Sequence, residues 1–361
     1  MLYRTHRPHT FADVVGQEHV VRTLKGALTS GRVAHAYLFT GPRGTGKTTL
    51  ARIFAKAIMC QNRSASGEPD NTCPHCVAVD NGSSLDLIEI DGASHGRVDE
   101  IRALKESASV AASSAEKKIF LIDEVHMVTT GAFNALLKVL EEPPSHVMFL
   151  FATTDPQKIP ATVLSRVQRY DLRRLTIPEI ADKLMRIAAV EKMPLKPDAA
   201  QLIAAAADGA LRDAEVLLSK MHGMNVPALD VATVTDALGL VPHALHPEFF
   251  GYLVANDSAS ALAFLARLTE AGINLDIFAR DFLEYARAAM IAHANPALLA
   301  GVSGVHDHAT LTAHGQACTS EQHIRIIMAF TDARARMRTA SLPQLPLELA
   351  VLELAVTPSA N

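Results

Sequence analysis

Residues 36–48 read AYLFTGPRGTGKT, an apolar run followed by a glycine-rich loop. The loop at residues 41–48 has the spacing G-x-x-x-x-G-K-[ST], which is typical of a segment that binds the phosphates of a nucleoside triphosphate. Its glycines let successive backbone N–H groups curl around phosphate oxygens, because no Cβ blocks the necessary torsions. Leu50, Ile53 and Phe54 follow at helical spacing, so the loop ends at a helix N-terminus, which favours anions. A chance glycine-rich turn is the alternative, and the strand–loop–helix setting disfavours it.

Two side chains of this phosphate loop (residues 41–48) have separate predicted roles. Lys47 is predicted to bind the β- and γ-phosphates, and the Thr48 hydroxyl is predicted to ligate Mg²⁺. The residues predicted to contact the nucleotide at this loop are Gly41, Pro42, Arg43, Gly44, Thr45, Gly46, Lys47, Thr48 and Thr49.

Composition limits the class of protein. A chain of 361 residues with 49% hydrophobic and 20% charged residues is typical of a globular protein with two or three domains. The net charge of −4 gives no overall attraction to nucleic acid or to an anionic membrane, so any such surface must be local. The sequence shows no apolar run of about 18–20 residues and no signal-peptide pattern at its N-terminus, which predicts a cytoplasmic protein without a membrane partner.

The pattern of elements predicts an α/β domain over residues 1–175. Short apolar runs at 36–39, 87–90, 119–122, 148–152 and 167–172 alternate with helical patterns, which predicts a parallel sheet with helices on both faces. Residues 176–225 predict a small helical domain. Its first helix opens at a capping box, Thr176 to Glu179, and the next two are predicted at 199–207 and 211–221.

The last part of the chain, residues 226–361, predicts an all-α domain. Helices are predicted at 259–268, 276–292, 321–337 and 347–354, with a junction over 225–242 and a loop over 302–315.

Two carboxylates follow the apolar run at residues 118–122. Asp123 is predicted to hold Mg²⁺ through water, and Glu124 to orient and deprotonate an attacking water. An acidic pair after a strand is also typical of a solvated strand end. Its combination with the upstream phosphate loop favours the catalytic interpretation.

Three further polar residues suit phosphoryl transfer. Thr154 follows the run at 148–152, Arg166 precedes the last predicted strand, and Arg212 begins a helix of the second domain. Taken alone, each arginine is more typical of a surface or ion-pairing residue.

Taken together, the motifs resemble those of the gamma/tau family of bacterial DNA polymerase III subunits, the motor subunits of the AAA+ clamp loader. The matching segments are residues 7–17 (RPHTFADVVGQ), 35–39 (HAYLF), the phosphate loop, 123–127 (DEVHM), 133–138 (FNALLK), 140–144 (LEEPP), 152–156 (ATTDP) and 164–166 (LSR). The resemblance covers residues 1 to about 220, and beyond it the helical composition agrees with the collar of such subunits. It implies an AAA+ nucleotide-binding domain, a helical lid and a collar for ring formation.

The resemblance implies a role for each matching residue. Lys47 and Thr48 would serve ATP and Mg²⁺, and Asp123 with Glu124 would form the Walker B pair. The sensor-1 role falls to Thr154.

The basic residues acquire implied roles in the same way. Arg166 would be an arginine finger that reaches the ATP of a neighbouring subunit, although Val167 replaces the usual cysteine after it. Arg212 would be sensor 2, and Arg4, Arg7 and Pro8 would lie near the adenine.

The implied activity is ATP-driven loading of a sliding clamp onto primer–template DNA within a ring of clamp-loader subunits. Arg97 and Arg102 are candidates for DNA contact. Another AAA+ motor of the branch-migration type and a non-hydrolysing structural subunit are the alternatives. The cysteine insert disfavours the former, and the intact phosphate loop disfavours the latter.

A cysteine cluster at residues 60–80 departs from the family pattern. Cys60, Cys73 and Cys76 match a structural zinc module of four cysteines, but Asp70 stands where another cysteine is expected. Zinc accepts a carboxylate oxygen, so a Cys₃Asp site is chemically possible. His75 is an alternative fourth ligand, and loss of the metal with a knuckle held by packing is a third interpretation.

Overall fold

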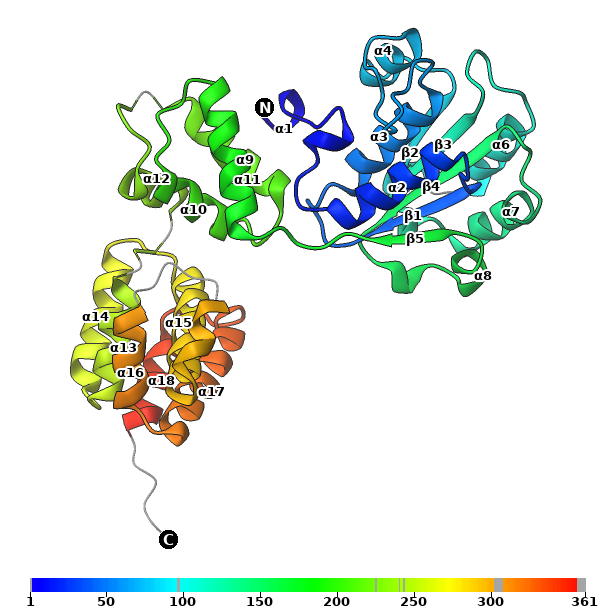
Figure 1. Ribbon diagram of the computed structural model, residues 1–361. Coiled ribbons are helices and arrows are strands. Elements are labelled where there is room, and N and C mark those ends of the chain that lie inside the picture. The colour runs from blue at the N-terminus through cyan, green and yellow to red at the C-terminus, as the bar shows by residue number, and fades with distance from the viewer. Residues whose placement is uncertain are drawn as a thin grey trace. The chain divides into compact units, whose positions relative to one another are not determined.

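The computed structural model describes residues 2–95, 98–224, 226–239, 241–242, 244–301 and 308–355. Contacts divide the chain into two compact units, Met1–Asn225 and Val226–Asn361 (Figure 1). Among the described helices, none has both the length and the apolar character needed to cross a bilayer.

The first unit contains a five-stranded sheet in the described residues, with the strand order β2-β3-β4-β1-β5. Every neighbouring pair is parallel. The strands are β1 (Ala36–Thr40), β2 (Leu87–Asp91), β3 (Lys118–Asp123), β4 (Val147–Thr153) and β5 (Gln168–Asp171). β1 and β4 are buried throughout, whereas β5 forms an edge of the sheet and is largely exposed. All five predicted strands are confirmed. For the buried inner strands the signal is strong, because apolar runs covered on both faces are distinctive in the sequence.

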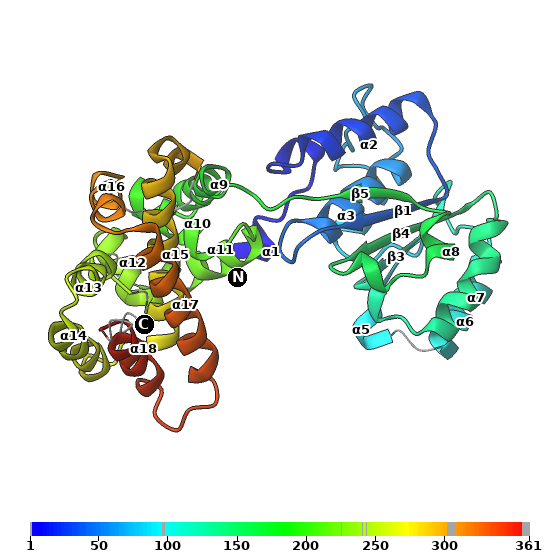
Figure 2. The ribbon, with the colours of Figure 1, turned by 90° about the horizontal axis from the view of Figure 1, so that it is seen from below.

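Alternate residues of the inner strands face two separate cores. Tyr37 and Phe39 of β1 pack with α2 (Glu18–Ser30) and α3 (Lys47–Met59), whereas Leu38 packs with α7 (Thr130–Glu141). Helices α2 and α3 lie on one face of the sheet and α6 (Val98–Ala108) and α7 on the other (Figure 2). The predicted fold class is therefore confirmed, with the sheet layered between helices and helices following it.

Shorter elements complete this part of the chain. They are α1 (Leu2–Thr5), α4 (Pro74–Asp80), α5 (Gly92–His95), α8 (Ala161–Leu164) and the 3₁₀ turns η1 (Phe11–Asp13), η2 (Val125–Met127) and η3 (Pro156–Lys158).

Three helices follow the sheet, namely α9 (Ile177–Val190), α10 (Pro197–Ala206) and α11 (Leu211–His222). The capping box at the start of α9 is confirmed. The Glu179 carboxylate accepts a hydrogen bond from the Thr176 amide at 2.8 Å, and the Glu179 amide donates to the Thr176 hydroxyl at 3.4 Å. The chain's beginning is tied to this bundle, because the Leu2 amide donates to the Ser219 hydroxyl of α11 at 3.1 Å.

The second unit is helical in its described residues. Its helices are α12 (Val231–Leu238), α13 (Leu245–Val254), α14 (Ser258–Glu270), α15 (Leu275–Ala294), α16 (His308–Ala317), α17 (Ser320–Met337) and α18 (Leu345–Ala355), with the 3₁₀ turn η4 (Pro296–Gly301). Phe249, Phe282 and Phe330 meet in its core at centroid distances of 4.8–5.6 Å.

Two expectations for this unit are wrong. Helix α12 lies inside the predicted junction over 225–242, and α16 occupies much of the predicted loop over 302–315, of which residues 302–307 lie outside the described residues. Gly315 weakens the helical pattern of α16, yet the packing requires it. A Cβ at Gly315 would lie 2.7 Å from the Ala289 carbonyl oxygen and 2.9 Å from the His293 nitrogen of α15.

Candidate nucleotide-binding site

The phosphate loop joins the end of β1 to the start of α3, as predicted. Gly41, Gly44 and Gly46 have φ values of 140°, 77° and 98°, in the region that side chains rarely adopt. A Cβ on Gly44 would also lie 2.8 Å from the Ala210 Cβ. The loop therefore needs glycine for its torsions and, at Gly44, for the close approach of the segment before α11. Its backbone ends at the N-terminus of a 13-residue helix, which provides N–H groups and a dipole for anions.

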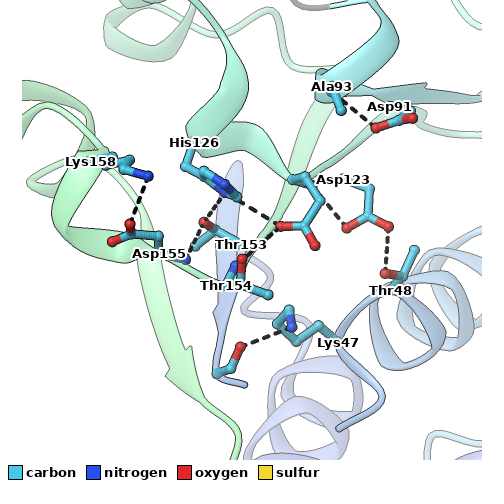
Figure 3. Close-up of polar contacts among 12 residues, drawn as sticks. Lys47, Thr48, Asp91, Ala93, Asp123, His126, Thr153, Thr154, Asp155 and Lys158 are labelled. Atoms are coloured by element: carbon cyan, nitrogen blue, oxygen red, sulfur yellow. Dashed lines mark hydrogen bonds and ion pairs between the residues drawn. The ribbon is translucent and has the colours of Figure 1, made fainter. Parts of the chain in front are cut away.

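Lys47 folds back over the loop. Its Nζ donates to the carbonyl oxygens of Gly41 at 2.9 Å and Pro42 at 2.8 Å (Figure 3). The residue is only 6% exposed. Burial lowers the pKa of Lys47, while the carboxylates of Glu124 and Asp123 oppose that shift. These two carbonyls accept from two of the three donors of the ammonium group.

Thr48 and Asp123 form a hydroxyl–carboxylate pair. The Thr48 hydroxyl donates to Asp123 Oδ2 at 2.7 Å, and Asp123 Oδ1 accepts from the Glu124 amide at 2.9 Å. Because β3 and β1 are parallel to β4 on either side of it, the ends of these strands meet at one edge of the sheet. Both oxygens are hard ligands of the kind that Mg²⁺ prefers, so these residues fit the predicted metal.

Glu124 has a strained backbone. Its φ of 44° and ψ of 46° lie in the left-handed region, which is uncommon for a residue with a side chain. Its Oε2 accepts hydrogen bonds from the Thr154 amide at 3.3 Å and from the Thr154 hydroxyl at 3.1 Å. Such strain persists where the surroundings enforce it, and it is common at functional sites. The structure thus brings Lys47, Thr48, Asp123, Glu124 and Thr154 together.

Arg212 and Arg7 approach the loop from other segments. The Arg212 amide lies 3.5 Å from the Gly44 carbonyl oxygen, and the Arg212 guanidinium carbon lies 4.9 Å from the centre of the Tyr3 ring. Arg7 Nε donates to the Thr49 hydroxyl at 3.2 Å. Burial, followed by the nearby charge of Arg52, lowers the pKa of Arg7. Arg212 and Arg7 are therefore neighbours of the loop through contacts that the sequence did not specify.

Among the described residues, the side chains of Arg4 and Pro8 make no hydrogen bond or ion pair with the phosphate loop. Arg4 is exposed and donates from Nε to the Tyr3 hydroxyl at 3.2 Å, and Pro8 is half-buried. Their proximity to an adenine, like that of Arg7, stays a prediction. Arg97 lies outside the described residues, as does the side chain of Arg102.

Arg166 lies near the amino-terminal end of β1, whereas the phosphate loop follows the carboxyl-terminal end of that strand. Arg166 precedes β5 and lines a groove of about 540 Å³ with Glu141 and with residues 34–36 at the start of β1. Its Nη2 pairs with Glu141 Oε1 at 2.8 Å, and its Nη1 donates to the Thr162 carbonyl oxygen at 2.6 Å. The five residues of β1, at about 3.3 Å each, separate it from its own loop by roughly 16 Å. The structure therefore does not bring Arg166 to the site in its own chain.

Sequence reasoning did not single out His126, which lies beside Glu124. Its Nδ1 lies 3.0 Å from the Thr153 hydroxyl and 3.4 Å from Glu124 Oε2 (Figure 3). The sequence offered only one clue to this contact, namely that His126 stands two residues after Glu124 within the DEVHM segment.

A second cluster lies between α3 and α4. The ligand atoms of Cys60, Asp70, Cys73 and Cys76 all lie within 4.8 Å of one another, whereas His75 is not part of this group. The sulfurs of Cys60 and Cys73 are 4.0 Å apart, close to the separation of two thiolates around one zinc ion with bonds of about 2.3 Å. Burial raises the pKa of Cys60 and Cys76. The residues fit a tetrahedral Cys₃Asp site.

Known proteins match most of this chain. Residues 16–176 match the family model "DNA polymerase III, delta subunit", and residues 229–360 match "DNA polymerase III subunits gamma and tau domain III". The chain is 38% identical over 360 residues to DNA polymerase III subunit tau of Bacillus subtilis (strain 168), which covers 99% of this chain and 63% of that protein. It is 39% identical over 299 residues to DNA polymerase III subunit tau of Escherichia coli (strain K12), covering 83% and 46% respectively.

A shorter relative is matched over most of its own length. DNA polymerase III subunit gamma of Buchnera aphidicola subsp. Acyrthosiphon pisum (strain APS) is 37% identical over 285 residues, which are 79% of each chain. The present chain thus spans less than two thirds of the two tau proteins and more than two thirds of this gamma protein. The chain belongs to the DNA polymerase III subunit gamma/tau family.

Proposed function

We propose that this chain is a cytoplasmic ATPase, the motor subunit of a bacterial clamp loader that places a sliding clamp on primed DNA. The observation that carries the proposal is the convergence of Lys47, Thr48, Asp123, Glu124 and Thr154 at one edge of the sheet. Arg166 lies at the other edge, paired with Glu141. The other predicted groups lie together, but Arg166 lies too far away to reach them. This arrangement suits a site to which a neighbouring subunit contributes the arginine.

The phosphate loop would bind ATP by exchanging internal hydrogen bonds for phosphate contacts. Lys47 Nζ would leave the carbonyl oxygens of Gly41 and Pro42 for the β- and γ-phosphates. Mg²⁺, held by Thr48 and through water by Asp123, would neutralise charge on the phosphate oxygens when bound. Glu124 would orient the attacking water and accept its proton, and Thr154 would sense the γ-phosphate while contacting Glu124.

Ring assembly would supply the missing cation. Arg166 of one subunit would leave Glu141 and reach the γ-phosphate held by the next subunit, so ATP would strengthen the interfaces and hydrolysis would weaken them. An arginine supplied in trans is worth about 10³–10⁵ in rate in related phosphoryl transfer. The partners are then the other clamp-loader subunits, the sliding clamp and primer–template DNA. Arg212, from the proposed lid at 176–225, would contact the γ-phosphate, and residues 226–361 would form the collar.

The Cys₃Asp cluster would hold a structural zinc ion. Cys60 is the C-cap residue of α3 and Cys73 the N-cap residue of α4, so the ion would link the two helices and stabilise the folded insert.

The test is steady-state ATPase activity of the chain assembled with its partner subunits, with and without clamp and primed DNA. We expect stimulation by clamp and primed DNA, and loss of turnover in Lys47→Ala and Glu124→Gln variants. Activity without such stimulation would favour a branch-migration motor. Lack of ATPase activity in the wild-type assembly would favour a structural subunit.

A further inference from the structure

The carboxylate of Glu124 is held by one of its two oxygens. Oε2 receives the Thr154 amide, the Thr154 hydroxyl and the approach of His126 Nδ1 at 3.4 Å. Within the described part of the chain, Oε1 has no hydrogen-bond partner. This asymmetry fixes the rotation of the carboxylate and leaves one oxygen for a water molecule.

His126 is itself held firmly. Its side chain is 11% exposed, and its Nδ1 lies 3.0 Å from the hydroxyl of Thr153, which is fully buried. The Thr153 hydroxyl also accepts from the Asp155 amide at 3.0 Å. The turn that carries His126 is anchored by the buried side chain of Val125 and by the Met127 amide, which donates to the Glu124 carbonyl oxygen at 2.9 Å. The imidazole therefore has little freedom to leave Glu124.

The groups around the imidazole limit which of its nitrogens can carry the proton. A neutral imidazole carries one donor nitrogen and one acceptor nitrogen. Nδ1 faces both the Thr153 hydroxyl and Glu124 Oε2, and a carboxylate can only accept. The approach of Nδ1 to Glu124 is attractive only when Nδ1 carries the proton, and the Thr153 hydroxyl is then the acceptor of the 3.0 Å hydrogen bond.

We propose that His126 is a positioning residue for the hydrolysis reaction. Its Nδ1–H, steadied by Thr153, holds Glu124 Oε2 together with Thr154, so that Oε1 is presented to the attacking water. The inference rests on the proposed ATPase function. It adds a residue on η2 that acts through Glu124.

A matched pair of substitutions tests the role of the Nδ1 atom. In His126→Asn, the side-chain amide nitrogen can occupy the place of Nδ1, whereas in His126→Gln the amide reaches the place of Nε2. Both are polar and similar in size, so a general packing defect would affect both. His126→Phe removes both nitrogens.

The assay is ATPase activity in the assembled ring with clamp and primed DNA, together with ATP binding and the thermal unfolding midpoint of each variant. Losing the Nδ1–H beside a charged general base is expected to lower kcat about tenfold or more in the Gln and Phe variants. KM and ATP affinity are expected to stay unchanged, and Asn is expected to retain most of the wild-type kcat.

Each contrary outcome has a distinct meaning. An active ring in which the Gln and Phe variants turn over like wild type, or faster, would overturn the role of His126 alone. Equal losses in the Asn and Gln variants, or a rise in KM without a fall in kcat, would also overturn it. A wild-type ring without ATPase activity would overturn the proposed function, and this role with it.

Discussion

Replacing Arg166 with alanine separates binding from turnover. Arg166 lies roughly 16 Å from the phosphate loop of its own chain, at the far end of β1. Across that distance in water, two unit charges interact by only about 0.3 kcal/mol before salt screening. The affinity of the isolated chain for ATP should therefore change by less than about twofold in Arg166→Ala. Turnover of the assembled ring should fall by about 10³–10⁵ if Arg166 has its proposed role, in which the charge acts on the nucleotide of a neighbouring subunit.

The two quantities are measured separately. ATP affinity is measured by titration of the isolated chain, and turnover by phosphate release from the ring with clamp and primed DNA. Arg186→Ala is a suitable control, because Arg186 is exposed on α9 and its hydrogen bond is to Asp182 of the same helix. A tenfold loss of affinity in the isolated Arg166→Ala chain would show that the arginine acts on its own site. Unchanged turnover of the ring would equally refute the reasoning.

Three further perturbations have defined outcomes. Gly44→Ala should lower the free energy of unfolding by about 2–4 kcal/mol, because the new Cβ would add backbone strain at a positive φ and would also overlap with Ala210. Gly31→Ala is the control, because Gly31 has a φ of 67° and nothing within 4 Å of the new Cβ, so only the backbone strain should appear. Equal losses of stability for the two variants in chemical denaturation would contradict the overlap at Gly44. The Asp70→Cys variant should bind zinc more tightly than wild type, because thiolates are softer ligands than carboxylates. Competition with a chelator, followed by elemental analysis, measures this affinity, and an unchanged zinc affinity would exclude Asp70 as a ligand. Burial raises the pKa of Glu215 to about 7, above an unfolded value of about 4.3. The contribution of the neutral carboxyl group to the stability of the fold is therefore full below pH ~4 and is lost as the pH rises through 7. Glu215→Gln stays neutral and should therefore be more stable than wild type by up to about 4 kcal/mol at pH 8 and similar to it at pH 4. A stability difference that does not depend on pH in thermal unfolding would refute the assignment.

The sheet and the phosphate loop were predictable because their signals are local. Strands buried on both faces are continuous apolar runs, and glycines at fixed spacing are required by torsions such as the φ of 98° at Gly46. Asp123 and Glu124 could be placed for a similar reason, since a parallel strand delivers the residues after it to a known edge of the sheet.

The remaining features depend on contacts between distant segments. Helix α13 contains Pro247 near its start, and α16 contains Gly315, so both lack a clear helical pattern. The pairing of Arg166 with Glu141 and the contact of Arg7 with Thr49 join residues 25 and 42 positions apart. The contact of His126 with Glu124 is close in sequence, but it depends on a turn that no periodicity predicts.

The short strand β5 has a consequence for how copies of this chain meet. It exposes charged side chains, and Arg169 pairs with Asp171 at 2.8 Å. A strand from a second copy could extend the sheet at β5 only by crowding these charges against its own. Such an edge resists open-ended stacking of sheets into aggregates, which leaves association to side-chain surfaces that can be matched to a particular neighbour.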